Sequence, residues 1–211
     1  MASGWKPRFG ASDFDIRADE ALHHGFFNLD RVTVTHRCFL GGEATIGREL
    51  YRRRDAVCVL PYDPVLRCVV LIEQFRVGTL DHPRGPWQLE LVAGLVEPGE
   101  SVEDVARREA VEEADLQLGE IESISRFTPS PGAVREYIDL LCARVDAGSA
   151  GGVHGLAEEG EDILVHVLSL DDACALVQDG VIDNAPAIIA IQWLQMHSPR
   201  LEQQWVQPET S

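Results

Sequence analysis

The chain has 211 residues, 45% hydrophobic and 25% charged, which is enough to bury a core and typical of a globular protein. Its formal net charge of −17 disfavours binding to nucleic acid or to an anionic membrane surface. No stretch approaches the roughly 18 apolar residues of a membrane helix, and the N-terminus lacks the apolar core of a signal peptide. A small anionic substrate would need local cations, from arginines, a metal or both.

The first 54 residues predict a small β-rich subdomain of short strands separated by turns. A β-branched run at 31–40 and a second run at 44–51 flank Gly41 and Gly42, which together are typical of a hairpin turn.

The segment 55–200 predicts the main domain, in which strands interleave with helices. Strands are expected at 55–62, 67–76, 87–92, 123–128, 136–145 and 162–168, and helices at 101–114, 170–179 and 184–197. Because the strands outnumber and interleave with the helices, the pattern predicts an α+β fold, with a mixed β-sheet between helices in an α/β/α sandwich. The chain after Ser198 is expected to be less ordered, and 201–211 is assigned as a tail.

The clearest predicted helix carries acids where its apolar stripe should continue. Val102 and Val105 begin that stripe, and the same face then carries Glu109 and Glu113, with Glu112 beside them. Exposed like charges at this spacing oppose one another by about 0.2–0.5 kcal/mol, and burial raises the cost unless a counter-charge is present. Converging carboxylates suit a hard cation such as Mg²⁺, whereas a solvated acidic face would place the acids opposite the valines.

The segment that enters this helix, 93–100, is a glycine-containing loop. Such a loop leaves backbone amides and carbonyls accessible to phosphate or metal, although most glycine turns are only turns. Ser101 is a candidate N-cap, and Asp104 three residues later comes close to a capping box.

Together these residues resemble the Nudix box, G-x5-E-x7-R-E-U-x-E-E-x-G-U, in which U is a bulky aliphatic residue. The matching positions are Gly94, Glu100, Arg108, Glu109, Glu112, Glu113 and Leu116. Ala110 departs from the motif by its small size, and Asp115 stands where the family has glycine. If Asp115 ends the helix with a positive φ, we expect a small stability cost and no loss of chemistry.

The resemblance extends over nearly the whole chain to the bacterial ADP-ribose pyrophosphatase branch of that family. The matching segments are HGFFNLD (24–30), LIEQFRVG (71–78), the box, SPG (130–132), HGLAEEGEDILVHV (154–167) and IDNAPAIIAIQWLQ (182–195). It implies the Nudix fold and hydrolysis of ADP-ribose to AMP and ribose 5-phosphate, with two or three Mg²⁺ ions that Mn²⁺ can replace. It also implies a homodimer whose N-terminal segments help to form the partner's site.

Individual roles follow from the same resemblance. Glu159 is implied as the catalytic base. The implied metal ligands are the Ala93 carbonyl, Glu109, Glu112, Glu113 and Glu161. Phe26 and Phe27 are implied to pack on the adenine from the partner subunit. The other implied substrate contacts are Arg48, Glu49, Arg53, Arg76, Leu95, Ser130, Pro131, Gly132 and Glu136.

Several alternatives stay open at this level. On the residues alone, the acids at 158–161 fit surface loop charge, and Phe26 and Phe27 fit a plain core. The substrate alternatives are another nucleotide sugar such as GDP-mannose, or a dinucleotide, since residues 133–135 depart from the branch. A non-catalytic ADP-ribose-binding regulator is a different class, which typically lacks box carboxylates that this chain retains.

The cysteines indicate the compartment. The five of them, Cys38, Cys58, Cys68, Cys142 and Cys174, include no C-x-x-C pair. This pattern predicts neither disulfides nor a zinc site and fits the reducing cytosol, so a cytoplasmic location is expected.

Overall fold

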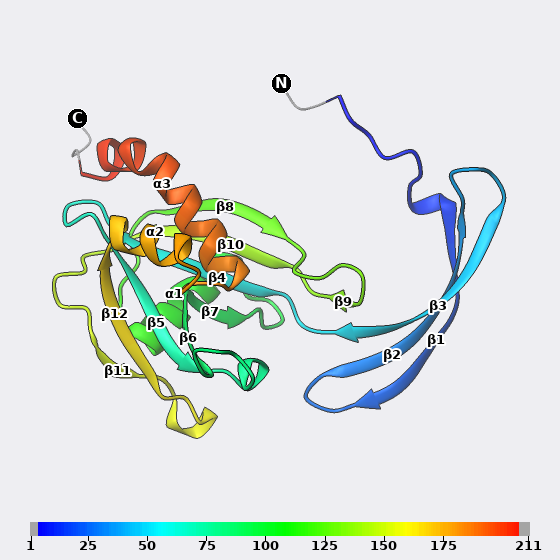
Figure 1. The fold of residues 1–211 in the computed structure, drawn as a ribbon, viewed down its shortest axis with the longest axis horizontal. Helices are drawn as coiled ribbons and strands as arrows, with labels where there is room; N and C mark the ends of the chain where they lie inside the picture. The colour runs from blue at the N-terminus through cyan, green and yellow to red at the C-terminus, as the bar shows by residue number, and fades with distance from the viewer. Residues whose placement is uncertain (1–3, 207–211) are drawn as a thin grey trace. The chain divides into compact units, whose positions relative to one another are not determined.

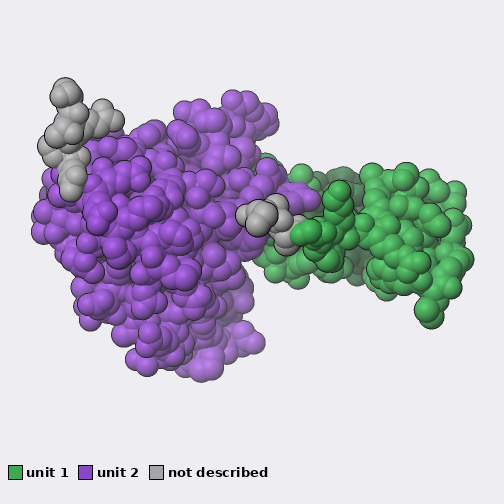
Figure 2. Space-filling model, turned by 90° about the horizontal axis from the view of Figure 1, so that it is seen from above, with its two compact units in different colours: residues 1–54, 128–136 green, residues 55–127, 137–211 purple. Residues whose placement is uncertain are grey.

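The computed structural model describes residues 4–206, apart from the side chain of Glu159. The chain forms two compact units, coloured separately in Figure 2. One contains 1–54 together with 128–136, and the other contains 55–127 and 137–211. The sequence had assigned 128–136 to the main domain, but its strand pairs with the N-terminal sheet.

The first unit is built on a four-stranded sheet in the order β1-β2-β3-β9. These strands are β1 (Phe14–His24), β2 (Asn28–Arg37), β3 (Glu43–Arg52) and β9 (Val134–Arg135), preceded by a short 3-10 helix at Ala11–Asp13. The β2–β3 hairpin is confirmed, with Gly41 and Gly42 both at positive φ in its turn. The prediction gave no separate strand for the largely polar β1.

The second unit contains a mixed eight-stranded sheet and three helices (Figure 1). Its strands are β4 (Ala56–Asp63), β5 (Cys68–Phe75), β6 (Trp87–Glu90), β7 (Val92–Leu95), β8 (Ile121–Phe127), β10 (Ile138–Arg144), β11 (Gly152–His154) and β12 (Ile163–Ser169). Its helices are α1 (Val102–Ala114), α2 (Leu170–Gln178) and α3 (Ala185–Val206), with 3-10 turns η2 (Val77–Thr79) and η3 (Ala157–Glu159). The main path runs β11-β12-β5-β4-β10-β8, in which β4 and β10 are parallel.

Alternate residues of the central strands point to opposite sides of the sheet, as the pleat requires. Val57 and Val59 of β4 pack into a cluster with α1. Leu60 and Tyr62 of the same strand pack into a second cluster with α2 and α3. The predicted α/β/α sandwich is therefore confirmed, with helices on both faces of the mixed sheet.

The strand predicted at 87–92 is in fact two strands that diverge. β4 and β5 pair with each other only next to their hairpin, and beyond it β6 pairs with β5 while β7 pairs with β4. Leu91, which is buried, lies between the two short strands. The split places Ala93 and Gly94 on β7, against α1.

Helix α1 begins and ends as the sequence predicts. The Ser101 side chain accepts the Asp104 N–H at 3.2 Å, and the Asp104 carboxylate accepts the Ser101 N–H at 3.4 Å, which completes a capping box. Asp115 ends the helix in the left-handed conformation, with φ 51°. A short polar side chain tolerates this conformation better than a branched one, at a small cost relative to glycine.

Helix α3 continues well past its predicted end at His197. Pro199 lies inside the helix, although proline normally ends one. The expectation of a less ordered chain after Ser198 is wrong for 199–206, because Leu201 and Trp205 extend the buried stripe of the helix. The rest of the assigned tail, 207–211, lies outside the described residues. Within 4–206 no helix has the length and apolar character that a membrane crossing requires.

We expect Leu201→Ala to lower the free energy of unfolding by about 2–5 kcal/mol, because it leaves a cavity at a fully buried position. Met196→Ala, at a residue of the same helix that is 71% exposed, is the matched control and should change stability by less than about 0.5 kcal/mol. Urea unfolding followed by circular dichroism measures both. Equal small effects would mean that the last turns of α3 do not pack on the core.

Candidate active site

The acidic face of α1 turns toward β7. Glu113 is only 3% exposed and lies in line with the buried apolar residues of the helix, as the spacing of the apolar stripe predicted. Its Oε2 accepts the Ala93 N–H at 3.0 Å, which joins the helix to β7. The side chain of Glu109 is 14% exposed and that of Glu112 is 30% exposed, so the three acids range from buried to half-buried.

Burial dominates the electrostatics of these acids. Loss of solvent, together with the charges of Glu109 and Glu161, raises the pKa of Glu113 to about 8, against the opposing effects of the Ala93 hydrogen bond and the charge of Arg76. Burial also raises the pKa of Glu109, against the opposing effect of Arg108. The carboxylates are therefore close enough to repel one another in a poorly solvated place.

Arg108 forms ion pairs with three neighbouring acids. Its Nη1 donates to Glu109 Oε1 at 2.7 Å and to Glu112 Oε2 at 3.1 Å. Its Nε and Nη2 donate to the carboxylate of Glu100 at 3.2 and 3.3 Å. The motif contained Arg108 and Glu100, but the sequence gave neither a role. Among the described residues, Glu113 forms no such ion pair.

Gly94 is required by a close approach. A β-carbon at this position would overlap the carboxylate and Cγ of Glu109. The glycine of the motif therefore lets the side chain of Glu109 lie directly over the backbone of β7.

The donor chemistry of this group fits a hard divalent cation. Within residues 4–206, no three His, Cys, Asp or Glu side chains form a ready-made cation cage. The fit rests instead on Glu113, a buried carboxylate that has no ion pair with any described residue and lies beside other carboxylates that repel it. A cation bound by oxygen ligands relieves that repulsion. Glu109 would have to exchange part of its contact with Arg108 for the cation.

The loop before β12 is tied to α1 and to its own end. The Gly155 N–H donates to the Glu112 carbonyl at 3.2 Å, and the Leu156 N–H donates to Glu161 Oε2 at 3.0 Å. Glu159 ends η3 in this loop, and its side chain lies outside the described part of the structure. The second unit thus contains the predicted site residues Ala93, Leu95, Arg76, Glu109, Glu112, Glu113, Glu159 and Glu161.

The other predicted residues belong to the first unit, where an aromatic group is their main feature. The rings of Phe26 and Phe27 pack edge to face with their centroids 4.6 Å apart, and the ring centroid of Tyr51 is 5.1 Å from that of Phe27. The Arg53 guanidinium lies 5.2 Å from the centre of the Phe27 ring, and its Nη1 is 3.3 Å from Glu136 Oε1. A hollow of about 410 Å³ is lined by His23, Phe26, Phe27, Leu29 and Tyr51, three of which the sequence missed.

The remaining predicted contacts of this unit are on its surface. Arg48 donates from Nη1 to the Gly47 carbonyl at 2.8 Å, and Glu49 pairs with Arg31 at 3.6 Å. Ser130, Pro131 and Gly132 form the exposed turn that leads into β9.

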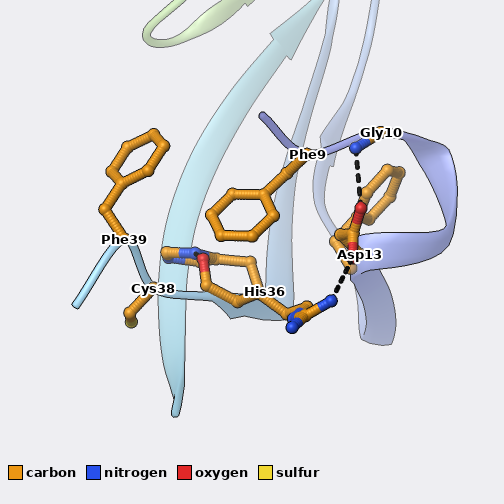
Figure 3. Close-up of a pocket in the computed structure, with 8 residues that line it drawn as sticks. Phe9, Gly10, Asp13, His36, Cys38 and Phe39 are labelled. Carbon is orange, nitrogen blue, oxygen red and sulfur yellow. Dashed lines mark hydrogen bonds and ion pairs between the residues drawn. The ribbon is translucent and has the colours of Figure 1, made fainter. Parts of the chain in front are cut away.

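A second hollow of the first unit contains no predicted site residue (Figure 3). It has a volume of about 410 Å³ and is lined by Phe9, Gly10, Asp13, Phe14, His36, Arg37, Cys38 and Phe39. The Phe9 and Phe39 rings stack at 5.2 Å, and Asp13 pairs with Arg37 at 3.0 Å. Its aromatic walls indicate an apolar surface on this unit.

Fold and site together define an α/β/α sandwich in which a glycine-containing strand and an acidic helix carry a group of buried to half-buried carboxylates. The chain belongs to the NUDIX family, whose domain model matches residues 52–208.

Three known proteins illustrate the similarity. The ADP-ribose pyrophosphatase of Escherichia coli strain K12 is 48% identical over 198 residues, which cover 93% of this chain and 95% of that protein. The GDP-mannose pyrophosphatase of Cronobacter sakazakii is 33% identical over 184 residues, covering 86% and 95%. A solved structure described as an ADP compounds hydrolase superposes with a TM-score of 0.67 at 20% identity, over 91% of this chain and 96% of that one, a likeness of fold.

Proposed function

We propose that the protein hydrolyses the pyrophosphate bond of ADP-ribose and releases AMP and ribose 5-phosphate. The observation that carries the proposal is the buried carboxylate of Glu113 on the Nudix-box helix, hydrogen-bonded to Ala93 beside other acids. The substrate is supported by the relative named ADP-ribose pyrophosphatase, which is more similar to this chain than the one named for GDP-mannose, at 48% against 33% identity.

We assign the Ala93 carbonyl and the carboxylates of Glu109, Glu112, Glu113 and Glu161 to two or three Mg²⁺ ions, which Mn²⁺ can replace. Divalent cations supply charge neutralisation of the diphosphate and a lowered pKa of bound water. The chain's own contribution is to hold the acids in place. The Ala93 N–H fixes Glu113, and Arg108 fixes Glu109 and Glu112.

Glu159 is assigned as the general base that takes the proton of the attacking water. Its loop is anchored at Gly155 on the carbonyl of Glu112 and at Leu156 on the carboxylate of Glu161. These two anchors tie the loop that carries Glu159 to the same helix and the same acid that belong to the metal group.

The adenine is assigned to Phe26 and Phe27, whose side chains line an open aromatic hollow. An adenine base can stack on such rings. Arg76 is assigned to the diphosphate, and Leu95 is assigned as a substrate contact. Further contacts are assigned to Arg48, Glu49, Arg53, Ser130, Pro131, Gly132 and Glu136.

A homodimer with shared active sites is part of the proposal. In the first unit, Val32 is the only described hydrophobic residue that is buried, while Trp5, Ile16 and Phe39 are 77%, 60% and 69% exposed. Apolar surface of this kind favours a protein partner. The proposed partner is a second copy, whose active site the first unit would complete. A reducing cytoplasm suits the five free cysteines.

We expect purified protein with Mg²⁺ to cleave ADP-ribose with a kcat/KM at least about tenfold above that for GDP-mannose. Glu159→Gln should lower kcat by about 10²–10⁴-fold with little change in KM, because it removes a proton acceptor. Release of AMP, followed by chromatography across a panel of nucleotide sugars, measures both. Preference for GDP-mannose would contradict the assignment of ADP-ribose as the substrate. Tight binding of ADP-ribose without turnover would favour a non-catalytic ADP-ribose-binding regulator.

We expect Phe26→Ala to raise the KM for ADP-ribose about tenfold while kcat changes little, because base stacking on an aromatic ring is worth about 1–3 kcal/mol. Phe26→Tyr retains an aromatic face and is the matched control. Steady-state kinetics of the two variants separate loss of stacking from loss of the side chain's other contacts. A KM for Phe26→Ala equal to that of the wild type would contradict the assignment of Phe26 to the adenine site.

A further inference from the structure

Arg76, the first residue after β5, is held by a carboxylate that is not part of the Nudix box. Its Nε and its Nη2 both contact Glu90 Oε2 at 2.8 Å. Glu90 is the last residue of β6, and its side chain is 20% exposed against 39% for Arg76. A charge-assisted contact in this partly sheltered place is stronger than an ordinary surface ion pair.

The contact occupies one edge of the guanidinium group. Among the described residues, the second terminal nitrogen, Nη1, contacts no acceptor. A guanidinium has five N–H donors in a fixed plane, so an arginine held through Nε and Nη2 keeps Nη1 and one Nη2 hydrogen for a second anion. The orientation of that remaining edge is then set by Glu90.

The pair lies beside the acidic group described above. Glu90 comes three residues before Ala93, and β6 and β7 are separated only by Leu91. Arg76 is near enough to Glu113 for its charge to act on that carboxylate. A diphosphate bound through cations to the acidic group would therefore meet a guanidinium that is already fixed in direction.

We propose that Glu90 is a positioning residue, which holds the Arg76 guanidinium so that its free edge binds the diphosphate of the substrate. The inference rests on the proposed function, from which the role of Arg76 is taken. Pre-orientation removes part of the ordering cost of binding, so Glu90 should act on affinity and only through Arg76.

A double-mutant cycle tests this directly. Glu90→Gln should raise the KM for ADP-ribose about tenfold, the effect of one lost charge-assisted hydrogen bond, with kcat changed less than about threefold. In the background of Arg76→Ala, Glu90→Gln should raise the KM little further, because Glu90 then has no arginine to position. Glu90→Asp should recover part of the affinity, and Glu103→Gln, which removes an exposed charge from α1, should have no effect.

Two results would overturn the inference. Additive effects of the two substitutions would mean that Glu90 does not act through Arg76. A lower KM in Glu90→Gln would mean that Glu90 only competes with the substrate for the arginine. Equilibrium binding of ADP-ribose with Mg²⁺ in the Glu159→Gln background repeats the cycle without the proposed general base, so its result stands even if the wild type yields no AMP, the outcome that would refute the proposed function alone. Failure of this variant to bind ADP-ribose in the presence of Mg²⁺ would refute both.

Discussion

Glu113→Gln should remove nearly all turnover and at the same time stabilise the metal-free protein at alkaline pH. The activity falls because a proposed cation ligand loses its charge, and a decrease of about a hundredfold or more is expected. The stability rises because the substitution removes a carboxylate that is 3% exposed and has no ion pair among the described residues. Loss of function and gain of stability rarely occur together at a purely structural residue.

The sign of the pH effect follows from the direction of the pKa shift. Burial raises the pKa of Glu113 from its ordinary value of 4.5 to about 8 in the folded protein. The folded state therefore holds this proton more tightly than the unfolded state. The extra proton held by the folded state stabilises it fully below pH 4.5, and this stabilisation is lost as the pH rises through about 8. Each pKa unit corresponds to about 1.4 kcal/mol, so the upper limit is a few kcal/mol.

Thermal melting in EDTA at a series of pH values measures the effect. The wild type should lose stability between pH 5 and 9 more steeply than Glu113→Gln, and Mg²⁺ should restore part of the loss in the wild type. Glu103→Gln removes an exposed charge from the same helix and is the control, with wild-type activity and slope. A variant that is inactive and also less stable at every pH would contradict the account.

Gly94→Ala is the second large effect that we expect. A β-carbon at position 94 would overlap the side chain of Glu109, which Arg108 holds at 2.7 Å. The carboxylate or the β7 backbone must then move, at a cost of about 1–3 kcal/mol in the free energy of unfolding. Because the displaced acid is a proposed metal ligand, turnover should fall by about a hundredfold or more.

Two further variants separate the causes. Adding Glu109→Ala to Gly94→Ala removes the overlap, so it should recover stability but not activity. Gly10→Ala, at a glycine with open space around its Cβ position, should change neither. Urea unfolding and steady-state turnover give the comparison. If Gly94→Ala kept full activity, the close approach of Glu109 to β7 would have no functional meaning.

The sequence predicted those features whose causes are local. The capping box at Ser101 and the inward position of Glu113 follow from spacing along one helix, and both are confirmed. The left-handed conformation of Asp115 was anticipated as a condition, because helix ends require it. The central strands β4 and β5 were predicted from their continuous apolar runs, which a sheet covered on both faces requires.

What the sequence missed depends on contacts that are distant along the chain. The pairing of Val134 with Tyr51 and the contact of Arg76 with Glu90 each join separate strands, and no local pattern marks them. The length of α3 was missed because Pro199 is a strong stop signal that the burial of Trp205 overrides. Tertiary packing outweighs local propensity in such cases.

Counting bound Mn²⁺ by electron paramagnetic resonance tests most directly whether the acids of α1 bind a divalent cation. The wild type should bind at least one Mn²⁺ per chain. The Glu109→Gln and Glu113→Gln double variant should bind it at least about tenfold more weakly, while Glu103→Gln binds as the wild type does. Equal Mn²⁺ binding by the double variant and the wild type would contradict the account.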